Sequence, residues 1–355
     1  MGFVFIICVI LGLWCIAAMI IYRNSISYRK ADQIIFAKTQ DHVDIALHRY
    51  LPRGQTKKNC PVILCPGLGA NRYNMDMDDQ YSIAIHLANQ GYDCFILELR
   101  GVGLSEMPEK YYLGRWKITF EDFVRKDIPA AIQKVLSITF ADRVHWVGHS
   151  MGGMVLYAYA IEQKNQFIQS GTIIASPANF NYMAKMSKLA QFGKFILHFF
   201  PVLHLRLFTF LALPGIGWLD RHLGKWLYEP KHCETSMIQY AAVNLVIDLP
   251  ATLMQRFERW VNKKDFCSED GIHWQDRLSE ITIPLYLLAG TSDRLAIVEG
   301  IQAVYQQLGT QDKTFRVFGK DHGEPSEYAH GDFVIGRSAP ERVFPSISEW
   351  VNQHD

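Results

Sequence analysis

The sequence has no excess of charge of either sign and no low-complexity segment. Its 36 Lys and Arg residues nearly balance 35 Asp and Glu residues, which leaves a formal net charge of +1. Such a chain has no field that would attract a polyanion along its whole surface, so nucleic acid is not an expected partner. With 49% hydrophobic and 20% charged residues, the chain also lacks the composition of a disordered protein and has enough apolar material for a sizeable core.

The seven cysteines include no C-x-x-C pair and none of the local spacings typical of zinc ligands. Two of them, Cys8 and Cys15, belong to the apolar N-terminus, which leaves an odd number for the remainder of the chain. An odd number fits a reducing compartment better than a disulfide framework. The sequence also lacks a phosphate-binding glycine loop, and "RGVGLSE" has only a fragment of the dinucleotide fingerprint. We therefore expect no metal and no cofactor.

The first 22 residues contain no charged side chain. About 20 apolar residues suffice for a helix to cross the hydrocarbon core, so residues 1–22 are expected to form a transmembrane anchor. A cleavable signal peptide is the alternative, but the positive n-region is missing, the apolar run is longer than usual and no clear cleavage site follows. Arg23, Arg29 and Lys30 follow the apolar run, and the positive-inside rule then places the bulk of this single-pass protein in the cytoplasm.

Beyond the N-terminus, short apolar runs alternate with helical patterns. The apolar runs are "VDIALHRYL", "PVILCPG", "DCFILELRG", "RVHWVGHS", "GTIIASP", "PLYLLAG" and "TFRVFG". This alternation predicts an α/β fold with a mostly parallel central sheet and helices on both faces. Continuous apolar runs are typical of central strands, whereas the alternating "DIALHRYL" favours an antiparallel edge strand at the start. In such sheets the chemistry gathers where strands end and helices begin.

Ser150 lies at one such place, between the predicted strand "RVHWVG" and the predicted helix "MGGMVLYAYAIEQ". Gly148 and Gly152 flank it in a G-x-S-x-G pattern. A sharp strand-to-helix turn strains the backbone of a nucleophilic serine and brings it close to neighbouring chain, where larger side chains would clash. For this motif alone, a serine that only caps the helix is the alternative. The stretches described next favour a nucleophile.

A serine that accepts an acyl group needs donors for the oxyanion of its tetrahedral intermediate. The backbone N–H of Met151, directly after Ser150, can be one of them. We expect the second donor to be the backbone N–H of Leu68, which lies between two glycines in "PGLGA", after the second predicted strand. An ordinary turn is the alternative interpretation of that loop.

The general base, and the carboxylate that orients it, are expected after later strands. Asp293 lies in the loop directly after the predicted strand "IPLYLLAG", and no acidic residue follows the strand "GTIIASP". Asp293 is therefore the predicted carboxylate. For the base, His322 and His330 both follow the last predicted strand, and their spacing alone does not separate them.

Together these stretches resemble the α/β-hydrolase superfamily, in its esterase and lipase branch. The stretches that carry the resemblance are "CPGLGANRYNMD", "LANQGYDCFILELRGVGLS", "GHSMGG", "AGTSDRL" and "HGDF". Their order, serine then acid then histidine, is the order of that family. The "HGDF" stretch is similar to the histidine loop of acid lipases and related bacterial lipases. The resemblance therefore implies that His330 is the base, in a catalytic triad with Ser150 and Asp293.

About a hundred residues separate "ASPANF" from "IPLYLLAG", far more than a loop of an α/β unit normally has. We expect a helical cap over the active site at residues 179–281. Its first half is apolar, but Arg206, Pro201 and Pro214 argue against a second membrane span. These apolar side chains are expected to form the core of the cap, and part of them to line an acyl-chain tunnel or rest on the bilayer surface.

The expected organisation is an anchor (1–22), a basic linker (23–40), the first part of the α/β core (41–178), the cap (179–281) and the second part of the core (282–355). The expected function is membrane-anchored serine hydrolysis of a small-molecule or lipid carboxylic ester with an apolar acyl group, through an acyl-enzyme. The alternatives are an acyltransferase that uses the same triad and a non-catalytic, membrane-tethered binding module.

Overall fold

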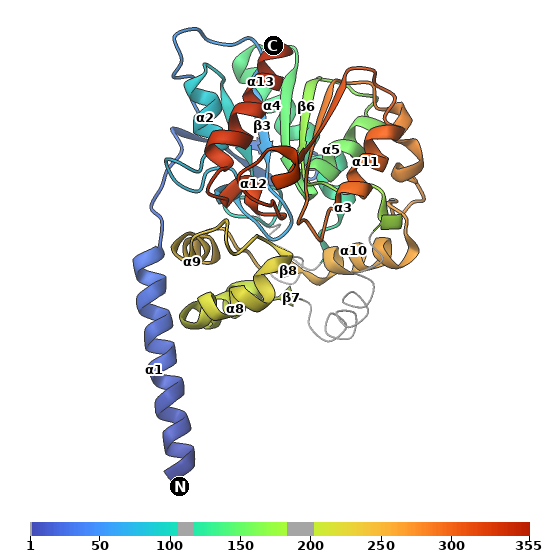
Figure 1. The fold of residues 1–355 in the computed structure, drawn as a ribbon. Helices are drawn as coiled ribbons and strands as arrows, with labels where there is room; N and C mark the ends of the chain where they lie inside the picture. The colour runs from blue at the N-terminus through green and yellow to red at the C-terminus, as the bar shows by residue number, and fades with distance from the viewer. Residues whose placement is uncertain (1, 106–116, 183–201) are drawn as a thin grey trace.

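The computed structural model describes residues 2–105, 117–182 and 202–355 (Figure 1). A mostly parallel sheet of eight strands forms its centre, in the order β1-β2-β4-β3-β5-β6-β9-β10. The strands are β1 (Gln33–Lys38), β2 (Asp44–Tyr50), β3 (Val62–Cys65), β4 (Cys94–Leu97), β5 (Val144–His149), β6 (Ile168–Ile174), β9 (Leu285–Gly290) and β10 (Lys313–Phe318). β2 is antiparallel to both β1 and β4, and the other pairs are parallel.

The antiparallel edge differs from the prediction. "VDIALHRYL" forms β2, which has a partner on each side, and the edge strand is β1, paired with β2 in the register Gln33↔Arg49. The prediction that β2 is the edge strand is therefore wrong. The prediction that residues 33–38 belong to a linker is also wrong, because they form β1. β1 was missed because "QIIFAK" has a mostly exposed surface and buries only Ala37, as an edge strand with one covered face does.

The central strands are wholly buried, as their apolar runs predict: every residue of β3, β4, β5 and β9 is buried. The helices that cover the sheet are α2 (Ile83–Asn89), α3 (Phe120–Asp122), α4 (Ile128–Thr139), α5 (Met151–Glu162), α11 (Val298–Gln307), α12 (Asp332–Ile335) and α13 (Phe344–Gln353). α2 and α13 contact each other, while α5 lies against β5 through Trp146, whose Nε1 donates to the carbonyl oxygen of Gly152. The fold is that of an α/β hydrolase.

Short 3-10 and π segments connect these elements. They are η1 (Arg72–Asn74), η4 (Phe123–Asp127), η5 (Phe180–Tyr182), η7 (Leu213–Gly215), η8 (Gly224–Trp226), η9 (Trp274–Glu280), η10 (Lys320–His322) and η11 (Ala339–Val343).

The region between β6 and β9 is mainly helical where the structure describes it. Its elements there include β7 (Val202–Leu203), α7 (Leu205–Ala212), α8 (Ile216–Leu223), α9 (Thr235–Asn244), β8 (Leu249–Pro250) and α10 (Ala251–Lys263). The start of the apolar half of the expected cap, Pro201 included, lies outside the described residues.

Helix α1 (Gly2–Ser25) projects away from the body of the molecule, and the C-terminus lies at the far end (Figure 1). Within the described ranges, α1 is the one helix long and apolar enough to cross a membrane. Its second half contacts α7, η7 and α9. This contact places the cap elements beside the apolar helix.

Candidate active site

Ser150 occupies the turn between β5 and α5 with φ 54° and ψ −119°, a strained conformation for a residue with a side chain. Its N–H donates to the carbonyl oxygen of Ile174 at 2.8 Å. The flanking glycines have a steric reason: a Cβ on Gly148 would overlap the backbone of Gly152, and a Cβ on Gly152 would overlap the carbonyl oxygen of Cys65. The turn therefore presents the hydroxyl as a nucleophile elbow does.

The structure brings Ser150, His330 and Asp293 into one chain of hydrogen bonds. His330 Nε2 lies 2.8 Å from Ser150 Oγ, and His330 Nδ1 lies 2.8 Å from Asp293 Oδ2. The other carboxylate oxygen of Asp293 accepts from the backbone N–H groups of Leu295 (2.8 Å) and Ala296 (2.9 Å). Because a carboxylate only accepts, the imidazole proton belongs on Nδ1, and the lone pair of Nε2 faces the serine hydroxyl.

The other candidate histidine is not part of this arrangement. His322 lies in η10 and is exposed, whereas His330 is only 7% exposed. Both residues follow β10 along the chain, but only the loop with His330 reaches the end of β5, where His149 Nε2 lies 3.0 Å from the carbonyl oxygen of His330.

The predicted oxyanion donors lie beside Ser150. The loop after β3 approaches so closely that a Cβ on Gly67 would lie 3.1 Å from the Cβ of Ser150. Gly67 N–H is already used, because it donates to Asn74 Oδ1 at 3.0 Å. The N–H groups of Leu68 and Met151 donate to no atom of the described residues, so both are available to a ligand.

Two supporting residues were missed in the sequence. Asn74 Oδ1, the acceptor of Gly67 N–H, also lies 3.1 Å from His149 Nδ1. His149 thus connects the oxyanion loop to the loop with His330. Burial lowers the pKa of His149 to about 3, so the ring is neutral and carries one N–H. It can therefore donate either from Nδ1 to Asn74 Oδ1 or from Nε2 to the carbonyl oxygen of His330, but not both. Asn74 lies in "CPGLGANRYNMD" and His149 in "GHSMGG", but their spacing in the sequence does not predict that they contact each other.

A cavity of about 440 Å³ opens beside Ser150 and His330. Its other walls include the oxyanion loop, the cap helices α7, α8 and α9, and α12. The apolar lining includes Ile216, Leu227, Ile238, Ala241, Leu245 and Val246. A cavity of this size and lining suits an apolar chain attached to a group that reacts at Ser150.

Comparisons with known proteins agree with this fold. A family model described as alpha/beta hydrolase fold matches residues 61–323. Lipase member M of Homo sapiens is 23% identical over 357 residues, which cover 89% of this chain and 82% of the relative. A lipase of Caenorhabditis elegans is 27% identical over 136 residues, 36% of this chain and only 33% of that protein. A solved membrane phospholipase A, described as a bacterial virulence factor, is 16% identical with a TM-score of 0.56, covering 99% of this chain and 97% of that chain.

Proposed function

The chain belongs to the α/β hydrolase fold family, with lipases among its relatives, and we propose that it is a membrane-anchored serine hydrolase of carboxylic esters with an apolar acyl group. The observation that carries the proposal is the hydrogen-bond chain from Ser150 through His330 to Asp293 at the wall of an apolar cavity. Lipase names among the relatives, and a membrane phospholipase A among proteins of the same fold, support a lipid ester as the substrate.

The proposed mechanism has two half-reactions. Ser150 Oγ attacks the ester carbonyl carbon while His330 Nε2 takes its proton, and the carbonyl electron pair moves to the oxygen. The backbone N–H groups of Leu68 and Met151 stabilise this oxyanion. Its collapse releases the alcohol, which receives the proton from His330, and leaves an acyl-enzyme. Water then attacks the acyl-enzyme by the same steps, while Asp293 keeps the imidazole oriented.

The acyl-chain preference tests the role of the cavity. We expect kcat/KM for p-nitrophenyl esters to rise about tenfold or more from acetate to octanoate, because each buried methylene contributes up to about 0.8 kcal/mol. Ala241 lies in α9 and lines the cavity, so Ala241→Phe is expected to lower the octanoate value about tenfold and the acetate value less than about twofold. Equal losses for both esters would show that the cavity does not hold the acyl chain.

Contacts of α1 with the cap support a retained anchor instead of a cleaved signal peptide. Trp14 Nε1 donates to the carbonyl oxygen of Leu211 at 2.7 Å, and Asn244 Nδ2 donates to the carbonyl oxygen of Ser25 at 2.7 Å. Ala18, between these points on α1, is fully buried. Removal of α1 would expose the cap surface that these contacts cover.

The same contacts support a proposal for the depth of the cap in the bilayer. Trp14 precedes Ser25 by 11 residues, roughly 16 Å along a helix and about half of the ~30 Å hydrocarbon core. Leu211 lies at the level of Trp14. We therefore propose that the end of α7 and η7 lie inside one leaflet. Arg206, at the start of α7, shares a cavity wall with Tyr22, near the end of α1 where head groups are expected.

Exposed apolar side chains of the cap agree with that depth. They are Leu207 (54% exposed), Phe208 (60%), Leu211 (41%) and Trp218 (63%). Because α7 also lines the cavity beside Ser150, a lipid ester would enter the site from the bilayer and not from water.

Phe208 provides a test of this position. In the full-length protein in nanodiscs, Phe208→Asp is expected to lower hydrolysis of a bilayer-resident ester about tenfold, because an aspartate in the hydrocarbon region is unfavourable by about 2.5 kcal/mol or more. Hydrolysis of p-nitrophenyl acetate should change less than about twofold, since Phe208 is exposed and is not among the residues that line the cavity beside Ser150. Phe140→Asp, at a 91% exposed position at the end of α4, is the matched control. If both variants behave alike on the bilayer substrate, the cap does not enter the leaflet.

We also propose that the catalytic body lies in the cytoplasm. Three basic residues lie in the last turn of α1 or shortly after it. Arg29 is held by Asp76 and Asp79 at 2.8 Å and 2.6 Å, so the orientation signal rests mainly on Arg23 and Lys30. None of the seven cysteines, all of which lie in the described ranges, forms a disulfide, which suits a reducing compartment. Digestion of the body by protease added outside intact cells would contradict this orientation.

A further inference from the structure

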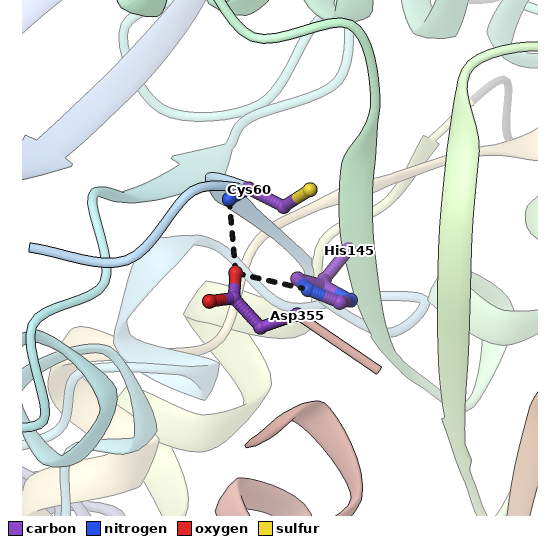
Figure 2. Close-up of side chains that lie close together, drawn as sticks. All are labelled: Cys60, His145 and Asp355. Carbon is purple, nitrogen blue, oxygen red and sulfur yellow. Dashed lines mark hydrogen bonds and ion pairs between the residues drawn. The ribbon is translucent and has the colours of Figure 1, made fainter. Parts of the chain in front are cut away.

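Cys60, His145 and Asp355 come together at the end of the sheet opposite to Ser150 (Figure 2). Cys60 precedes β3, His145 is near the start of β5, and Asp355 follows α13. The thiol sulfur, a ring nitrogen and a carboxylate oxygen lie within 4.8 Å of one another. The three residues are far apart in the chain, so no local spacing predicts this group, and the proposed triad does not use it.

His145 Nε2 points into this group without a hydrogen bond. The residue is fully buried, and Nε2 has no hydrogen-bond partner in the part of the chain that the structure describes. The carboxylate oxygen Oδ1 of Asp355 is 3.8 Å away, too far for a hydrogen bond. The other ring nitrogen, Nδ1, lies 2.9 Å from Ser170 Oγ. With its proton on Nδ1 and donated to Ser170, the ring turns the lone pair of Nε2 toward the thiol and the carboxylate.

The neutral ring is the state that a metal requires. The hydrogen bond between Nδ1 and Ser170 Oγ leaves Nε2 as the nitrogen that can bind a metal. A metal-bound histidine typically donates its second nitrogen to an outer partner, as His145 Nδ1 can to Ser170. A buried nitrogen without a partner is unfavourable in a folded protein, and a ligand at Nε2 would remove that cost.

The other two side chains supply the remaining donor types. The Asp355 carboxylate accepts from the backbone N–H groups of Cys60 at 3.0 Å and Asn59 at 3.4 Å, and these hydrogen bonds bring it beside the thiol. Thiolate, imidazole and carboxylate are all ligands of zinc, and tetrahedral bonds of about 2.0–2.3 Å place ligand atoms about 3.5 Å apart. The separations between the three ligand atoms, which are at most 4.8 Å, must therefore shorten by up to about 1 Å when zinc binds. Cys60, partly exposed before β3, and Asp355, after the last helix, are the ligands free to shift.

We propose that Cys60, His145 and Asp355 bind one zinc ion, with water as the fourth ligand and Ser170 orienting His145. The ion joins the segment before β3, the start of β5 and the segment after α13. It lies at the end of the molecule away from α1 (Figure 1), so its role is to hold the C-terminal segment to the sheet and not to act on the ester.

A second group of the same residue types shows why the buried nitrogen matters. Asp265, Cys267 and His273 also lie within 4.8 Å of one another. There, however, His273 Nδ1 already lies 2.8 Å from Asp265 Oδ2, and the histidine side chain is 54% exposed. We propose no site there, and Cys267 provides a matched control for Cys60.

The test measures zinc in the full-length protein, purified in detergent, stripped with EDTA, incubated with zinc chloride and dialysed. We expect about one zinc per chain in the wild type and in Cys267→Ser, and below about 0.2 in Cys60→Ser. Asp355→Asn, which alters no buried strand, is expected to reduce the bound zinc as well. Cobalt(II) in place of zinc should produce a thiolate-to-metal charge-transfer band that Cys60→Ser lacks.

The proposal is overturned if the wild type retains no more zinc than Cys60→Ser, or if cobalt gives the same spectrum in both. In that case Cys60, His145 and Asp355 are only neighbours in the fold and bind no metal. Ester hydrolysis is expected to stay within about twofold in Cys60→Ser, so this result is independent of the proposed function.

Discussion

Ser150→Ala is expected to lower kcat/KM for ester hydrolysis by about 10^5-fold. Without Oγ no acyl-enzyme forms, and the remaining rate comes from substrate binding and the oxyanion donors acting on water. The measurement uses p-nitrophenyl octanoate with the full-length protein in detergent. The variant is also expected to lose labelling by a fluorophosphonate probe, because that probe reacts with the activated hydroxyl that His330 Nε2 contacts at 2.8 Å.

Ser137→Ala is the matched control. Ser137 is exposed on α4, and its hydroxyl donates only to the carbonyl oxygen of Lys134, so its replacement should leave the rate within about twofold. Equal rates in wild type and Ser150→Ala would assign the hydrolysis to another site or to a contaminant. A folded wild type that neither hydrolyses esters nor reacts with the probe would favour the binding module over the enzyme.

The strands that could be predicted from the sequence are those whose own apolar residues show that they are buried. β3 and β9 are wholly buried and read as apolar runs in the sequence. β1 was not predictable in this way, because its edge position follows from its pairing with β2 and not from its own apolar pattern. The length of the segment between β6 and β9 predicts an insertion there, but the position of its helices beside α1 depends on contacts such as Trp14 with Leu211.

The candidate site was predictable where a motif is local. The strand-to-helix turn at Ser150 requires glycines beside the serine. In the structure, a Cβ on Gly152 would overlap the carbonyl oxygen of Cys65. Contacts between distant segments were not predictable from spacing. Asn74, in the loop after β3, contacts His149 at the end of β5. Cys60, before β3, lies close to His145 near the start of β5. Spacing likewise did not separate the two histidines: the resemblance of "HGDF" implied His330, and the structure places His330 Nε2 2.8 Å from Ser150 Oγ.

His330→Ala is expected to lower kcat/KM about as much as Ser150→Ala, by about 10^5-fold, whereas His322→Ala should cost less than about threefold. The reason is geometric: His330 lies 2.8 Å from both the nucleophile and Asp293, and His322 is exposed in η10. The same p-nitrophenyl octanoate assay measures both variants, with thermal unfolding as the check on folding.

Non-additivity decides whether His330 acts through Ser150. If the two side chains form one reacting unit, the double variant Ser150→Ala/His330→Ala should be no slower than either single variant. Independent roles would instead multiply the two losses. A large loss in His322→Ala together with a normal rate in His330→Ala would make the base assignment wrong, and the loop after β10 would then have to move for His322 to reach the end of β5.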